Sequence, residues 1–453
     1  MRKRTRRAAA AAVVAGAGLA LAACGGSGSG GAGGAAELTI SANAVAGGKN
    51  TEEAEWIEDW VIPRFEAAQA EAGVEVDVSF EPSGVDDEQY KTRLALDLQA
   101  GSGPDILTLD GIWVGEFAQA GYIEPLPEAD WEGWRHIPEA VARLATWEGE
   151  VYGVPWGTDG RVLFYHKELF ARAGLPAEWQ PRGWDEVLAA AGQLAELDGV
   201  TPLQLNAGTA MGEATTMQGV LPLLAGAGEE IHDGRAWTGA SDGLLRVLDL
   251  YERVYGGGMG DPVLQQEAQG RDRSFEQFAE GELGILVEGD YFWRAVVDPE
   301  GGTAPMENRD EAVGWALIPA AEPGAGVGGQ DFVSMSGGSV RAVNAAGDHP
   351  ELAHELLLFM NSAEALTAAV EGNARITART DVNERVLAGD PMLSFVADEV
   401  LPLTTYRPPL AEYPRVSVLL QEATGAVATG ERDAAEAAED YADGLEDATG
   451  GGG

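Results

Sequence analysis

Residues 74–109 read VEVDVSFEPSGVDDEQYKTRLALDLQAGSGPDILTL, and they hold two strand patterns with a helix pattern between them. Residues 74–80 alternate strictly between apolar and polar side chains, which is typical of a β-strand. Tyr90, Leu94 and Leu98 then recur at helical spacing until a glycine closes the pattern. The apolar run DILTL that follows favours a second strand.

The same alternation of elements continues on both sides of this stretch. Residues 37–41 favour a first strand, and residues 52–72 favour a helix that Pro63 should kink or restart. Residues 113–120 favour a further helix. Strand, helix, strand, helix and strand in this order predict an α/β fold with helices on the faces of an open sheet.

The second half of the chain repeats these patterns. We expect strands at 161–165 and 284–287, helices at 184–197, 275–279 and 350–360, and a last helix in the acidic, alanine-rich stretch after Glu431. Without its N-terminal leader the chain is too long for one ordinary domain and suits two lobes of roughly 200 residues each.

The N-terminus carries an export pattern. Five basic residues precede the apolar run 8–23, which is too short to span a bilayer and ends in Leu-Ala-Ala followed by Cys24. This ending resembles a bacterial lipobox, so we expect 1–23 to be a lipoprotein signal peptide and Cys24 to be lipidated. Residues 24–36, rich in glycine and serine, should form a flexible tether. The alternative is an ordinary cleaved signal with an incidental cysteine.

We therefore expect the protein on the extracellular face of the cell membrane, anchored by lipid. The pair Arg6-Arg7 is typical of twin-arginine export, but its flanking residues fit that signal poorly, so Sec and Tat export both stay open. Cys24 is the only cysteine in the chain, which excludes an intramolecular disulfide. No later apolar run has the length of a transmembrane helix.

The charge of the chain excludes several partners. It has 74 acidic against 29 basic residues, a formal net charge of −45. Such a surface repels phosphate backbones and anionic lipid headgroups, so we expect no nucleic-acid partner. The acidity fits a solvated surface that keeps the protein soluble, and it also fits adaptation to salt or a basic partner.

Signatures of enzymes are absent from the sequence. It contains neither a G-x-S-x-G elbow nor a P-loop, and its five histidines are scattered. We therefore assign no catalytic residue, no metal ligand and no cofactor. A glycosidase needs only a pair of carboxylates, and 74 acidic residues guarantee pairs by chance.

Tryptophans beside acidic residues give a more specific signal. A flat aromatic face stacks on a sugar ring while neighbouring carboxylates accept hydrogen bonds from hydroxyls. Three such groups follow expected strands or extended segments, where open α/β sheets bind ligands: Asp110 with Trp113, Trp156 with Asp159, and Glu288 with Trp293. Each tryptophan taken alone could equally anchor a core.

A series of motifs then points to a known family. They are GSGPDI (101–106), LD (109–110), FAQAGYIEPL (117–126), VYGVPW (151–156), LFYHKELF (163–170), AGL (173–175), GWDE (183–186), FAEGELG (278–284), GG (337–338) and PELA (350–353). Together with Asp159, their order and spacing resemble family 1 of the extracellular solute-binding proteins of carbohydrate ABC transporters, lipoprotein type. His166, Gly183 and Glu282 stand where the family usually has Asn, Thr and Lys.

The resemblance implies a two-lobed periplasmic-binding-protein-like fold with three interlobe crossing segments. The first lobe would be 37–157 plus 313–362 and the second 158–312 plus 363–445, with 446–453 a disordered tail. By the same resemblance, the saccharide would lie between the lobes, held by the following residues: Asn43, Asp110, Trp113, Trp156, Asp159, Glu288, Trp293, Gly338, and Arg375 or Arg379.

The function implied is capture of a mono- or oligosaccharide and its delivery to an ABC permease pair, by a monomer without enzymatic activity. Two other classes stay open at this point. One is a secreted carbohydrate-active hydrolase that uses an Asp/Glu pair. The other is an adhesin or structural lipoprotein, which would show neither sugar affinity nor lobe closure.

Overall fold

The computed structural model describes residues 35–85, 87–126 and 131–450 of the chain. The expected signal peptide 1–23, Cys24 and nearly all of the tether lie outside the described residues. Within these ranges, no helix has both the length and the apolar character needed to cross a membrane.

The first lobe is built on a five-stranded sheet of order β2-β1-β3-β13-β6. Its first three strands in the chain run parallel, and β13 pairs antiparallel with both β3 and β6. The strands are β1 (Ala36–Ala42), β2 (Val76–Pro82), β3 (Ile106–Asp110), β6 (Val154–Thr158) and β13 (Gly338–Val343), and a short hairpin joins β4 (Thr146–Trp147) to β5 (Glu150–Val151).

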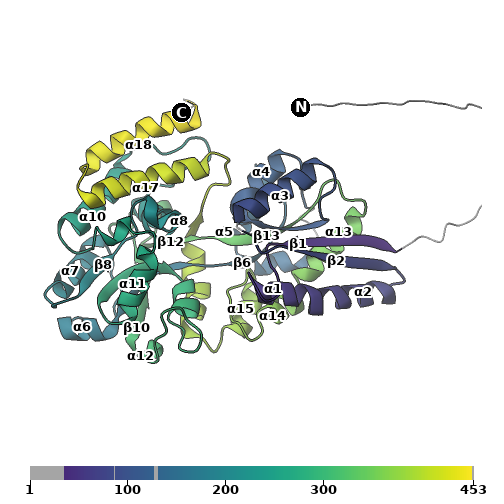
Figure 1. Ribbon diagram of the computed structural model, residues 1–453, viewed down its shortest axis with the longest axis horizontal. Coiled ribbons are helices and arrows are strands. Elements are labelled where there is room, and N and C mark those ends of the chain that lie inside the picture. Colours follow the sequence, from purple (N-terminus) through teal and green to yellow (C-terminus); the bar gives the residue numbers. More distant parts are fainter. Residues whose placement is uncertain (1–34, 86, 127–130, 451–453) are drawn as a thin grey trace, which may run out of the picture. The chain divides into compact units, whose positions relative to one another are not determined.

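Helices pack around this first sheet (Figure 1). They are α1 (Thr51–Trp56), α2 (Ile62–Glu71), α3 (Asp87–Gln99), α4 (Val114–Gln119), α5 (Glu139–Ala142), α13 (Pro350–Met360), α14 (Ala363–Ala369) and α15 (Thr380–Val386). Tyr90, Leu94 and Leu98 of α3 are buried, which confirms the helical spacing seen in the sequence. The helix restarts at Pro63 as expected: α2 begins at Ile62 with the proline in its first turn, and a π turn over Ile57–Val61 joins it to α1.

The second lobe has a four-stranded sheet of order β10-β7-β9-β8. Its strands are β7 (Arg161–His166), β8 (Thr201–Gln204), β9 (Leu283–Gly289) and β10 (Val313–Ala316). Every residue of β7 is buried. Val162 and Phe164 join one apolar cluster, whereas Leu163 and Tyr165 join the other. Successive side chains of a strand point to opposite faces, so both faces of this sheet are covered.

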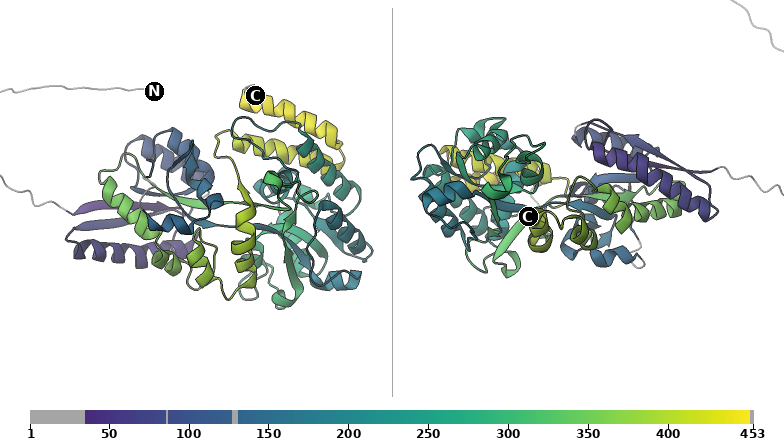
Figure 2. Two further views of the ribbon diagram at one scale, coloured as in Figure 1. Left: turned by 180° about the vertical axis from the view of Figure 1, so that it is seen from behind. Right: turned by 90° about the horizontal axis from the view of Figure 1, so that it is seen from below.

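The helices of the second lobe surround that sheet, and α17 lies beside α18 (Figure 1 and the left view of Figure 2). They are α6 (Lys167–Ala173), α7 (Trp184–Leu194), α8 (Glu213–Thr215), α9 (Leu221–Gly226), α10 (Asp242–Gly256), α11 (Gly270–Ala279), α12 (Arg309–Ala312), α16 (Pro391–Phe395), α17 (Tyr413–Thr429) and α18 (Ala434–Thr449). A three-stranded sheet flanks them, made of β11 (Ile318–Pro319), β12 (Phe332–Ser336) and β14 (Thr404–Tyr406).

The chain passes between the lobes at three places: from β6 to β7, from β12 to β13, and from α15 to α16. Two of the expected boundaries were wrong. Residues 313–336 belong with the second lobe, because β10 pairs antiparallel with β7. Residues 363–386 belong with the first, where the indole of Trp56 donates to the carbonyl of Ala365 at 3.0 Å.

The expected disordered tail also begins too early. α18 runs to Thr449, and its N-terminus carries a complete capping box between Asp433 and Glu436. Residues 446–449 are therefore the last part of a helix that packs on α17. Residues 451–453 lie outside the described residues.

Candidate ligand-binding cleft

A cleft of about 420 Å³ draws its lining from both lobes. The first lobe and the crossing segments contribute Asp110, Trp156, Gly157, Thr158, Asp159, Gly337, Gly338, Ser339, Arg375 and Ile376, and the second lobe contributes Arg161, Glu213, Ala214, Met217, Gln218, Arg271, Asp290, Arg294 and Arg407. A ligand held here would touch both lobes at once.

The end of β3 and the start of β13 form one side of the cleft. Asp110 ends β3 and accepts a hydrogen bond from the Ile112 N–H at 3.1 Å. Ser339 lies opposite Asp110 in the sheet, which brings the start of β13 to the same edge. A Cβ on Gly338 would come within 2.5 Å of Leu144 and 2.7 Å of the Gly157 carbonyl, so only glycine fits there.

The first crossing segment supplies an aromatic ring and a carboxylate. Trp156 is half-buried in the cleft lining, and the guanidinium of Arg341 lies 4.4 Å from its ring centroid. Asp159 forms an ion pair with Arg161 and accepts from the Gly337 N–H at 2.6 Å. Burial raises the pKa of Asp159, but these two donors and Arg407 outweigh it and hold the pKa below its usual range.

Arg407 connects the two sides of the cleft. Its Nη2 lies 3.3 Å from both carboxylate oxygens of Asp110, and its Nη1 lies 3.4 Å from Oε1 of Glu213 at the start of α8. Glu213 also accepts from the hydroxyls of Tyr413 and Ser417. One guanidinium therefore links a strand end of the first lobe to a helix of the second.

The second lobe presents two arginines, each fixed from behind by a buried acid. Glu288 in β9 is fully buried and holds Arg271 through two bonds, to Nε at 2.8 Å and to Nη2 at 2.7 Å. Asp290 accepts from Nε of Arg294 at 2.9 Å. Burial raises the pKa of Asp290, and neighbouring Asp159 adds to the rise against the opposing effect of Arg294.

Arg375 lies on the loop before α15 and is held more loosely. Its nearest carboxylate is Glu52, at 3.9 Å. Burial lowers the pKa of Arg375, and the positive charge of Arg294 lowers it further. Arg379, the alternative at this loop, is buried, pairs with Asp381 at 2.8 Å and does not line the cleft.

Five of the residues expected from the sequence line the cleft together: Asp110, Trp156, Asp159, Gly338 and Arg375. Glu288 does not line it but positions Arg271, which does. The remaining three lie elsewhere and need correction.

Trp113, Trp293 and Asn43 are packing residues in this structure. Trp113 is 6% exposed and packs against Tyr90 at 6.4 Å between ring centroids. Trp293 is 2% exposed, and its indole donates to Asp390 at 2.9 Å. Asn43 is buried, and its amide ties β1 to the carbonyl of Val85 and to Asp87.

Sequence reasoning missed most of the positive charge in the cleft. Arg161, Arg271, Arg294 and Arg407 come from four separate segments, and no motif connects them. The sequence contained a local indication for one of them, because Arg294 directly follows Trp293, which was expected to bind the ligand. It lies in a π turn over Phe292–Val296, a conformation that is frequent at functional sites.

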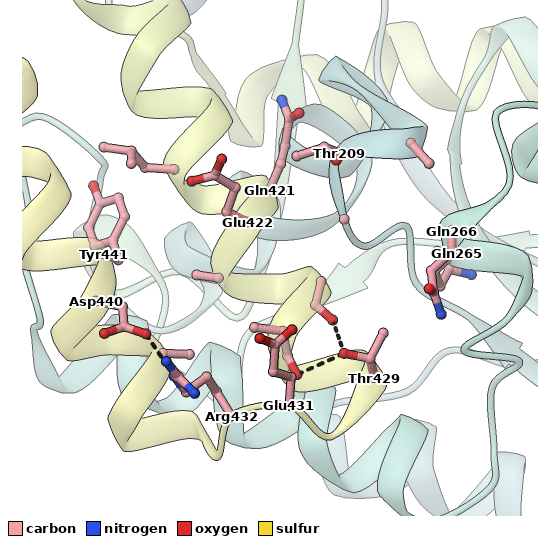
Figure 3. Close-up of a pocket in the computed structure, with 17 residues that line it drawn as sticks. Thr209, Gln265, Gln266, Gln421, Glu422, Thr429, Glu431, Arg432, Asp440 and Tyr441 are labelled. Carbon is pink, nitrogen blue, oxygen red and sulfur yellow. Dashed lines mark hydrogen bonds and ion pairs between the residues drawn. The ribbon is translucent and has the colours of Figure 1, made fainter.

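A second cavity, of about 570 Å³, lies within the second lobe alone (Figure 3). Its side chains come from α17, α18 and the loops near Thr209 and Gln265, and Arg432 donates to Asp440 there at 2.8 Å. A ligand in this cavity would not contact the first lobe. Among the described residues, no group of three or more His, Cys, Asp or Glu could hold a metal ion.

Two α/β lobes that line one cleft define a two-lobed binding-protein fold. Residues 47–367, more than half of the chain, match the family of bacterial extracellular solute-binding proteins, and the chain belongs to this family.

Similar proteins agree with this assignment. A binding protein of Brucella abortus is 26% identical over 237 residues, 51% of this chain and 54% of that protein, so the chain spans about half the length of this relative. The galactooligosaccharide-binding protein of Bacillus subtilis is 23% identical over 77% of this chain and 78% of its own length. The crystal structure of an ABC transporter solute-binding protein of Thermotoga lettingae, bound with α-D-tagatose, superposes with a TM-score of 0.66 at 25% identity, covering 91% of this chain and 100% of that one.

Proposed function

We propose that this protein binds a saccharide in the cleft between its lobes and delivers it to an ABC permease pair in the membrane. The observation that carries the proposal is that one cleft takes its lining from both lobes. Trp156 offers an aromatic face, and the backbone at Gly337 and Gly338 allows a ligand to approach closely. The relatives named for galactooligosaccharide and found with tagatose support a sugar as the ligand.

Binding in such a cleft would couple to closure of the lobes. A ligand shifts a conformational equilibrium only through different contact energies in the two states. A sugar that touches both Asp110 and Arg294 gains its full set of contacts only when the lobes are closed. The permease could then distinguish the loaded protein from the free one.

The hydrolase alternative gains no support from the relatives, because all three are described as binding proteins. The acid at the centre of the cleft, Asp159, is moreover paired with Arg161, and its pKa is held below the usual range. A general acid in a glycosidase needs a proton to donate, and an arginine partner opposes its protonation.

The test is a thermal-shift screen of the full chain against a saccharide panel, followed by X-ray scattering with the best ligand. A ligand at 100 times its Kd should stabilise the protein by about 2.7 kcal/mol. Its radius of gyration should fall at saturation. Release of new reducing ends from an oligosaccharide would instead establish the hydrolase, and an absence of any sugar affinity would favour the adhesin.

We also propose that the mature protein is a monomer tethered by a lipid on Cys24 to the extracellular face of the cell membrane. The support is the sequence of the export pattern and of the glycine-rich stretch that follows it. The measurement that tests the anchor is described in the Discussion.

A further inference from the structure

Positive charge gathers in the cleft of a strongly acidic protein. The chain carries 74 acidic and only 29 basic residues, yet five arginines line this one cleft: Arg161, Arg271, Arg294, Arg375 and Arg407. A neutral sugar needs both acceptors and donors around its hydroxyls. The balance of free acceptors and free donors in the cleft therefore indicates the chemistry of the ligand.

The carboxylates of the cleft already accept hydrogen bonds from the protein. Asp110 accepts from Arg407 and from a backbone N–H, and Asp159 accepts from Arg161 and the Gly337 N–H. Asp290 accepts from Arg294 and from the Gly160 N–H at 3.3 Å.

Glu213, the fourth acid of the cleft lining, accepts from Arg407, Tyr413 and Ser417. Each of the four carboxylates thus has at least two protein donors. The acceptors left for the hydroxyl groups of a ligand include Oδ2 of Asp159 and the buried Oε1 of Gln218, neither of which has a hydrogen-bond donor among the described residues.

Donors are also left over, because Nε of Arg161 and Nε of Arg407 are buried without a partner among the described residues and the other three arginines keep free N–H groups as well. Among the described residues, Arg375 has no hydrogen-bond partner, and its one ion pair is the 3.9 Å contact with Glu52. Arg294 uses only Nε toward Asp290, and Arg271 uses Nε and Nη2 toward Glu288. Both Nη atoms of Arg294 and Nη1 of Arg271 thus have no hydrogen-bond acceptor within the described part of the chain.

Arg294 and Arg375 also lie close enough to repel each other. The charge of Arg294 lowers the pKa of Arg375, after the larger effect of burial. An anion bound between the two guanidinium groups would relieve this repulsion and accept their free N–H groups. Arginine pairs with carboxylate and phosphate groups in a bidentate geometry, so both residue type and position suit such a ligand.

We propose that the ligand is an anionic sugar, whose carboxylate or phosphate is held between Arg294 and Arg375 with Arg271 as a further donor. This inference rests on the proposed function and specifies its substrate class. The neutral part of the sugar would lie against Trp156 and the backbone of Gly338, which line the same cleft.

The experiment compares acidic sugars with their neutral counterparts on the full chain by calorimetry. The probes are galacturonate and oligogalacturonate against galactose and galactotriose, and glucuronate and glucose 6-phosphate against glucose. We expect at least one acidic probe to bind about tenfold or more tightly than its neutral counterpart, with an affinity that falls as salt rises. A uronate or a phosphate as the better ligand identifies which anionic group the cleft takes.

Arg375→Gln is the decisive variant because Arg375 has the weakest ties to the rest of the protein. It should lower the affinity for the acidic sugar by about tenfold or more, and that for a neutral sugar by a much smaller factor. Arg415→Gln is the matched control, since it removes the same charge from an exposed position on α17 and should change neither affinity. Melting curves of both variants confirm that each is folded.

Three outcomes would overturn the inference. A neutral sugar that binds as tightly as its acidic counterpart would overturn it and leave the proposed function standing. If Arg375→Gln loses affinity for acidic and neutral sugars equally, the inference is also overturned while the proposed function stands. A panel in which no sugar of either kind binds would count against the inference and the proposed function together.

Discussion

Arg407 places its Nη2 3.3 Å from both carboxylate oxygens of Asp110, and this contact joins the segment after β14 to the end of β3. The same guanidinium reaches Glu213 in the second lobe. Ion pairs of this kind contribute little free energy on an exposed surface, but more when they are buried and belong to a network of several partners. The contact is therefore well placed to influence how the two lobes sit in the ligand-free protein.

Removing this contact should change lobe opening and affinity. Arg407→Gln leaves Asp110 and Glu213 without their shared cation, so we expect a larger radius of gyration without ligand and weaker sugar binding. Asp110→Asn breaks the same contact from the other side. In a double-mutant cycle the two changes together should cost about as much as either alone, with a coupling energy of about 1 kcal/mol or more. If the losses of the two single variants add up fully in the double variant, Arg407 and Asp110 are not energetically coupled.

The two tryptophans Trp156 and Trp293 should respond differently to truncation. Trp156→Ala removes an aromatic face from the cleft and should weaken sugar binding by about 2 kcal/mol, some thirtyfold in Kd. Trp293→Ala empties a buried position and leaves Asp390 without its indole donor, so it should lower the free energy of unfolding by about 3–5 kcal/mol. Calorimetric titration with parallel melting curves separates the effects. If Trp156→Ala binds the sugar normally, the Trp156 ring does not contact the ligand.

Local periodicity was enough to predict several elements of the first lobe. The strand at 105–109 and the helix marked by Leu94 and Leu98 are present as β3 and α3, because their apolar spacing directly sets which face is buried. The assignment of segments to lobes was less reliable. Residues 313–316 have a strand pattern, but whether they pair with β7 or with the first sheet depends on a partner about 150 residues away along the chain.

The site residues were predictable only in part, for a similar reason. Trp113 and Trp156 both lie near an acidic residue close to the end of a strand, and the sequence around them does not tell which ring faces solvent. Tyr90, far away in the sequence, covers Trp113, whereas Trp156 remains on the cleft. The cleft arginines come together only through the fold, so no spacing rule could find them.

The lipid anchor is tested by Cys24→Ser. We expect this variant to lose membrane association, while its ligand affinity stays equal to that of the wild type because the glycine-rich stretch separates Cys24 from the first strand. Fractionation of cells followed by calorimetry on the released protein measures both properties. Cys24→Ser protein that still sediments with membranes in high salt would contradict the lipoprotein assignment.

His166 should make the stability of the protein depend on pH in the mildly acidic range. This residue ends β7, is 3% exposed, packs its ring 5.3 Å from that of Phe278, and has a buried Nδ1 without a hydrogen-bond partner among the described residues. Burial lowers the pKa of His166, with Glu168 opposing the shift and Arg172 adding to it.

The sign of the effect follows from proton binding. Above the ordinary histidine pKa of about 6.5 both the folded and the unfolded states are neutral at this position, and His166 has no effect on pH dependence. As pH falls below that value, the unfolded state takes up a proton that the folded state resists, so the free energy of unfolding decreases. Melting temperatures should therefore fall between about pH 7 and pH 5 more steeply in the wild type than in His166→Asn.

His349→Asn, which changes a partly exposed histidine, serves as the control and should follow the wild-type curve. Parallel curves for wild type and His166→Asn would show that the buried imidazole has the same proton affinity in both states.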